Sequence, residues 1–108
     1  MSNEADLATV QRLLISGNSI PVQLRMHDGI DEDAYIELTS AIERLIEHYA
    51  SRSDVPKTLA LAFVDIGTAF DYAPGAYPEH ELERIEDIAQ ELSRLGQMLF
   101  SADESPGQ

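Results

Sequence analysis

The chain has no cysteine and no tryptophan among its 108 residues, and it has a single lysine, Lys57. Without cysteine, disulfides, thiolate zinc sites and cysteine nucleophiles are excluded. Basic residues are scarce altogether, because 7 stand against 20 acids and give a formal net charge of −13. Nucleic acids and anionic membrane surfaces are bound through lysine and arginine, so we expect neither as a direct partner.

Motifs that carry catalytic or metal chemistry are also missing. The sequence has no glycine-rich phosphate loop and no G-x-S-x-G nucleophile motif. Its three histidines, His27, His48 and His80, fit no zinc or di-iron spacing. The acids at 28–33 lack the spacing of a calcium loop and are better explained as helix caps. We therefore expect no metal, no organic cofactor and no enzymatic activity.

One carboxylate could depart from this expectation. Asp65 stands among Leu61, Ile66 and Thr68, and a carboxyl buried in apolar surroundings can act as a general acid or base. A position on the solvated rim of a helix explains it more simply, and we prefer that interpretation.

Long hydrophobic runs are absent too. The longest uninterrupted apolar stretch, residues 59–64, is far too short to cross a bilayer. Near the N-terminus, Glu4 and Asp6 stand where a signal peptide would carry positive charge. We therefore expect a cytoplasmic protein.

Helical periodicity is the strongest positive signal. Apolar residues recur every three to four positions, and no stretch alternates with a period of two. With the short connections at 51–54 and 73–77, this pattern predicts an all-α fold, a small antiparallel bundle of four to five helices. We expect one helical domain over residues 1–102 and a disordered tail over 103–108. The expected helices cover residues 3–16, 31–50, 54–72 and 78–100, with a further turn of helix at 20–26.

The apolar stripes of these helices also predict the core. Residues that repeat on one face of an amphipathic helix face the interior of a bundle. The expected core consists of Leu7, Val10, Leu14, Leu38, Ile42, Leu45, Leu59, Phe63, Ile66, Phe70, Leu82, Ile85, Ala89, Leu92 and Leu99.

The expected helix over 54–72 differs from the others because it is apolar on two sides. Leu59 and Phe63 lie on one side, and Leu61 and Val64 lie on the opposite one. Such a helix is either central in the fold or paired with something outside it. The exposure of Leu61, Val64 and Tyr72 decides between these alternatives.

We expect a partner-binding surface on that second side and on the Pro-Gly turn that follows. Apolar residues there would exclude water, tyrosines would anchor the partner, and acids would attract basic groups. In the alternative account, Tyr72 and Tyr77 simply cover the end of the bundle. The expected partner-binding residues are Leu61, Val64, Asp65, Thr68, Asp71, Tyr72, Tyr77, Glu79 and Glu81.

Two functional hypotheses follow. In the first, the chain is an acidic protein-binding module, a bacterial immunity protein or antitoxin-like inhibitor that neutralises a basic toxin such as a nuclease. In the second, it is a homodimeric helical adaptor or structural protein that pairs with its own copy.

Overall fold

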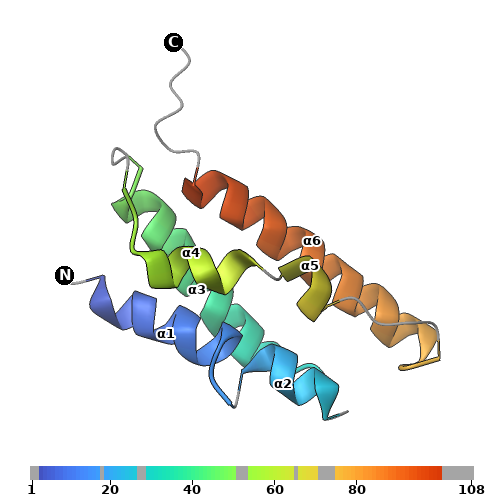
Figure 1. The fold of residues 1–108 in the computed structure, drawn as a ribbon. Coiled ribbons are helices and arrows are strands. Elements are labelled where there is room, and N and C mark those ends of the chain that lie inside the picture. Colours follow the sequence, from blue (N-terminus) through green and yellow to red (C-terminus); the bar gives the residue numbers. More distant parts are fainter. Residues whose placement is uncertain are drawn as a thin grey trace.

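The computed structural model describes residues 3–17, 19–26, 29–50, 54–64, 66–70 and 75–100, and of residues 67 and 68 only the backbone. Within these ranges all regular structure is helical, which confirms the expected all-α bundle (Figure 1). The expected tail over 103–108 lies outside them. The helices are α1 (Glu4–Leu14), α2 (Ile20–Arg25), α3 (Glu32–His48), α4 (Lys57–Val64), α5 (Ile66–Ala69) and α6 (Glu79–Phe100).

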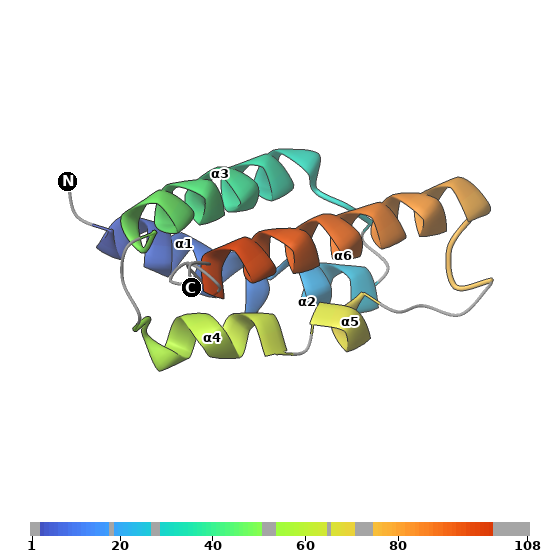
Figure 2. The ribbon, with the colours of Figure 1, turned by 90° about the horizontal axis from the view of Figure 1, so that it is seen from above.

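The four longest helices lie alongside one another in a bundle. Figures 1 and 2 show α1 and α4 running in one direction and α3 and α6 running in the other. The short α2 follows α1 along the bundle, and the short α5 follows α4 in the same way. Among the described residues, no helix has the length and apolar character needed to cross a membrane.

Two helix starts follow from side-chain caps. The Ser19 hydroxyl accepts a hydrogen bond from the backbone N–H of Val22, and Pro21 stands in the first turn of α2. The Asp31 carboxylate accepts one from the N–H of Ala34 at the start of α3. Both caps satisfy backbone donors that a helix start leaves without a partner. The expected turn of helix at 20–26 is therefore confirmed.

Within the expected helix over 54–72, the structure describes two helical segments, α4 and α5, on either side of residue 65, which lies outside the described residues. The first of them begins at Lys57, three residues after the expected start. The other expected helices agree with the observed bounds to within two residues at each end.

The core agrees with most of the expected positions. Of the expected residues, Leu7, Phe63, Leu82 and Ala89 are only partly buried, and the rest are buried. Several buried side chains were not expected there, among them Ile20, Leu24, Tyr35, Ile88 and Leu95. Leu24 has no exposed surface, so the short α2 is part of the core rather than a surface turn.

Candidate functional site

An apolar ridge runs along the outer side of α4. Leu61 and Val64 are 64% and 70% exposed, whereas Leu59 and Ala62 on the inner side are buried. The helix carries one charged residue, Lys57, at its start. The expectation that Leu61 and Val64 face solvent is confirmed, and Tyr72 lies outside the described residues. Large apolar side chains that adjoin at a surface indicate a contact with another molecule.

A groove lies on one side of this ridge, between α1–α2 and α4–α5. Its volume is about 300 Å³, and its lining is mostly apolar. Arg25 is the one charged residue among the described residues that line it. The lining includes Leu14, Ile15, Pro21, Val22, Leu61 and Ala62.

A second groove lies on the other side, between α4–α5 and the C-terminal half of α6. Its volume is also about 300 Å³, and it is lined by Phe63, Ile66, Ser93, Gly96, Gln97 and Phe100. A Cβ atom on Gly96 would stand 2.9 Å from the Phe63 ring, so only glycine lets this ring approach α6 so closely. The Phe63 and Phe100 rings meet edge to face with centroids 5.5 Å apart. We call the Leu61–Val64 ridge and its two grooves the α4 face.

Carboxylates gather elsewhere, around the start of α6. One hollow there, of about 540 Å³, includes Glu79, Glu83 and Glu86 in its lining. A neighbouring hollow is lined by Ile30, Glu32, His80, Glu81 and Arg84. We call the region of these two hollows the acidic end.

The acidic end contains one bidentate ion pair. The Arg84 guanidinium donates to the two carboxylate oxygens of Glu32 at 2.6 and 2.9 Å. This hydrogen bonding lowers the pKa of Glu32 and raises that of Arg84. Arg84 also lies over the ring of Tyr35, 5.2 Å from its centroid. The remaining acids leave this end strongly negative.

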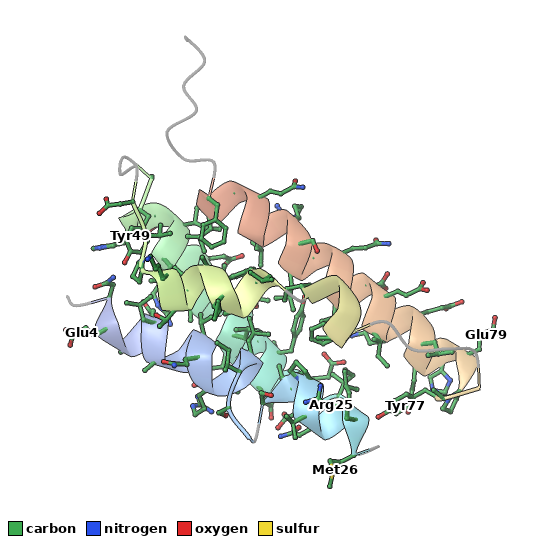
Figure 3. The ribbon with its side chains drawn as sticks, viewed as in Figure 1. Glu4, Arg25, Met26, Tyr49, Tyr77 and Glu79 are labelled. Carbon is green, nitrogen blue, oxygen red and sulfur yellow. The ribbon has the colours of Figure 1, made fainter. Side chains whose placement is uncertain are left out.

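Tyr77 is not the exposed anchor of the first hypothesis. It is 8% exposed, and its hydroxyl donates a 2.7 Å hydrogen bond to the carbonyl oxygen of Leu24. Its ring therefore closes the end of the bundle, as the alternative account holds. Figure 3 places Tyr77 and Glu79 at the end of the molecule away from α4.

The expected binding surface is therefore divided between two regions. Leu61 and Val64 belong to the α4 face, and Glu79 and Glu81 belong to the acidic end. Asp65, Asp71 and Tyr72 lie outside the described residues, as does the side chain of Thr68. Sequence reasoning did not single out Ile15, Val22, Gly96 or Phe100 as groove residues. Gly96 was the one sequence signal for a groove. Glycine inside a helix destabilises it by about 1 kcal/mol relative to alanine, so its presence indicates that another group packs closely against the helix there.

Some of the described titratable groups form surface salt bridges, which are Arg12–Glu37, Arg44–Asp6, Arg84–Glu32 and Arg94–Glu91. The pKa of Glu91 is lowered by its hydrogen bonds from Arg94, and burial raises the pKa of Tyr35. In the part of the chain that the structure describes, no three metal-ligating side chains come together. The described residues that line the grooves beside α4 are mostly apolar and include no carboxylate and no histidine.

Comparison of this chain with protein-family models, with curated proteins and with solved structures finds no match.

Proposed function

We propose that this protein is a non-catalytic binding module that uses the α4 face to bind a basic protein, as an immunity protein or antitoxin-like inhibitor binds its toxin. The exposure of Leu61 and Val64 carries this proposal. Two large apolar side chains that stay in water on the outer side of a helix, opposite the buried Leu59 and Ala62, gain free energy when a partner covers them.

The charge of the chain supports a basic partner. A net charge of −13 speeds the encounter with positively charged proteins and makes it dependent on salt. A nuclease suits this charge, because an enzyme that binds phosphates carries a surplus of lysine and arginine. The carboxylates of the acidic end line neither groove of the α4 face, so they act mainly on the approach of the partner.

The test is capture of a partner followed by reconstitution. The tagged full chain, a variant with Leu61→Glu and Val64→Glu, and an Ile36→Glu control are each exposed to lysate of the source cells. Ile36 is 60% exposed on α3 and lines neither groove, so this control replaces an exposed apolar side chain by a carboxylate away from the α4 face.

We expect the wild type and the Ile36→Glu control to retain one basic protein that the double variant loses. The captured protein, once purified, should bind more weakly as salt is raised, and its activity should be inhibited at equimolar ratio. Equal retention by the double variant would show that the α4 face is not the contact. A captured partner whose activity persists in the complex would exclude inhibition.

A further inference from the structure

A methionine near the end of α6 has a cation bound to its sulfur. Met98 is 45% exposed, and its Sδ atom accepts a hydrogen bond from Nη1 of Arg94 at 3.2 Å. The two residues are four positions apart, so they adjoin on the same side of the helix. Met98 lines neither groove of the α4 face, so the chemistry of its sulfur is independent of the proposed function.

Glu91 holds Arg94 in place. The Nε and Nη2 atoms of Arg94 donate to the two carboxylate oxygens of Glu91 at 3.1 and 2.7 Å. A contact of this kind, with two parallel hydrogen bonds, fixes the orientation of the guanidinium. The remaining terminal nitrogen, Nη1, is the one directed at the sulfur of Met98. A thioether is only a weak acceptor, so the reduced side chain uses little of this charged donor.

Oxidation of the sulfur would give Nη1 a stronger acceptor. In the reaction of a thioether with hydrogen peroxide, an S–O bond forms and the O–O bond breaks. The sulfur is oxidised by two electrons to a sulfoxide, and the peroxide leaves as water after the proton of the transferred oxygen passes to the departing one. The sulfoxide oxygen carries partial negative charge. Hydrogen bonds to such an oxygen from an ionised donor are about twice as strong as those between neutral groups.

Met26 provides a contrast within the same chain. It is 68% exposed at the end of α2, and within the described residues no donor contacts its sulfur, unlike that of Met98. A sulfoxide at Met26 would therefore have water as its hydrogen-bonding partner. The two methionines thus separate simple exposure to an oxidant from the presence of a donor that is already in place.

We propose that Met98 is a methionine-oxidation site whose sulfoxide is bound by Arg94. Oxygen adds to the side of the sulfur that faces Nη1, because an N–H group there stabilises the negative charge that develops on the oxygen. Methionine sulfoxide often disrupts its surroundings, because it places a polar group where an apolar one stood. At Met98 the new oxygen meets a donor, so the end of α6 tolerates oxidation.

The experiment treats the full chain with hydrogen peroxide and compares the melting temperature before and after. Met26→Leu leaves Met98 to react, and Met98→Leu leaves Met26. Met1 is common to both variants, so its oxidation cancels in the comparison. Mass spectrometry of peptides locates each sulfoxide. We expect Met98 to be oxidised in the folded chain and the melting temperature to change by less than about 2 °C.

Arg94→Ala in the Met26→Leu background removes the donor. Each variant is compared with its own oxidised form, so the lost contact with Glu91 is present in both states and cancels. We expect oxidation to lower the melting temperature by about 2–5 °C more than it does with Arg94 present. Circular dichroism checks that the reduced variant stays helical, and Arg94→Leu replaces it if it does not.

Arg12→Ala in the same background is the matched control. Arg12 also forms an exposed ion pair, with Glu37, and its side chain is about as exposed as that of Arg94. It lies on α1 and does not contact Met98. The response to oxidation should therefore be the same as with Arg12 present.

The configuration of the sulfoxide is a second readout, which a loss of stability alone would not change. A thioether gives two sulfoxide epimers, and a separate methionine sulfoxide reductase acts on each of them. With Arg94 present, we expect one epimer to predominate at Met98. Arg94→Ala should bring the ratio of the epimers closer to one.

Three outcomes would overturn the proposal. In the first, Met98 stays reduced under conditions that oxidise Met26. In the second, oxidation lowers the melting temperature equally with and without Arg94. In the third, Arg94→Ala leaves the epimer ratio unchanged. These measurements need no partner, so their result does not bear on the capture of a basic protein.

Discussion

The two ends of α6 lie in regions of opposite character. Its acids, from Glu79 to Glu91, all lie in the first 13 of its 22 residues, and the acidic end is built around its start. Its last nine residues carry no acid, and Gly96 and Phe100 line a groove of the α4 face. The acids of α6 are thus confined to the part of the helix on the side of the acidic end, where they contribute to the negative potential of the molecule. The part of α6 at the α4 face carries no acid and is suited to close contact.

Different interactions hold these two regions together. Near the α4 face, Phe63 packs on Gly96 and meets Phe100, so the contacts are apolar. At the acidic end, a buried hydrogen bond from Tyr77 and the Arg84–Glu32 ion pair join distant segments. Substitutions should therefore separate a region stabilised by packing from one stabilised by polar links.

The largest effect should come from the core behind the α4 face. Phe70 is 2% exposed, so Phe70→Ala should lower the free energy of unfolding by about 3–5 kcal/mol. Phe63→Ala should cost less, because Phe63 is only partly buried and lines a groove. Urea denaturation followed by circular dichroism measures both. Equal losses would mean that Phe63 belongs to the core and not to a surface.

The next effect should come from the polar link at the acidic end. Tyr77→Phe leaves the buried carbonyl of Leu24 without this donor, which should cost about 1–3 kcal/mol. Tyr49→Phe is the matched control, since Tyr49 accepts a hydrogen bond from the partly exposed Asn3 side chain. Water can replace that contact, so the control should lose less than about 1 kcal/mol. Similar losses in both variants would contradict a special role for Tyr77.

A smaller effect, of opposite sign, should come from charge reversal on α6. Glu83 stands four residues from both Glu79 and Asp87, and each such like-charge pair costs about 0.2–0.5 kcal/mol. Glu83→Lys should therefore raise the free energy of unfolding by about 0.5–1 kcal/mol. The gain should disappear in about 1 M salt, where these interactions are screened. A gain that persists there would have a cause other than charge.

The smallest effect concerns the pH dependence of the Arg84–Glu32 pair. Arg84 holds the pKa of Glu32 below its ordinary value, so the pair stabilises the fold above the unfolded pKa of about 4.3. That contribution is lost as pH falls through the lower, folded pKa. Both side chains are substantially exposed, so Arg84→Gln should cost at most about 1 kcal/mol near pH 7.

Thermal unfolding of the wild type and Arg84→Gln over a pH series measures this contribution. The difference between them should shrink on acidification. A difference that persists at low pH would point to the Arg84 cation above the Tyr35 ring, which does not depend on the Glu32 charge.

Local signals allowed most of the fold to be predicted. Asp31 caps α3 and Ser19 caps α2, and both were visible as cap residues followed by helical periodicity. The start of α4 was expected three residues too early, because Pro56 was placed in the first turn of the helix and the structure begins it at Lys57. The apolar stripe reports which residues face the core and does not fix the residue at which a helix begins.

The candidate site was predictable only in part. Leu61 and Val64 are exposed because the buried stripe of α4 lies on the opposite side of the helix. The helical spacing of apolar residues in the sequence is enough to predict this. The burial of Tyr77 was left open, because its acceptor, Leu24, lies far away in the chain. The grooves beside α4 depend on how five helices pack, and no local pattern in the sequence reports the spaces between helices.

The hydrogen bond from Tyr77 to Leu24 also bears on the lifetime of the native state. It joins residues 53 positions apart, so the chain must close a long loop before this bond can form. Closing the loop costs conformational entropy before the hydrogen bond can contribute any stabilisation. We therefore expect the bond to form after the folding transition state. Its energy then slows unfolding and leaves the folding rate nearly unchanged. We therefore expect Tyr77→Phe to speed unfolding and to leave the folding rate nearly unchanged.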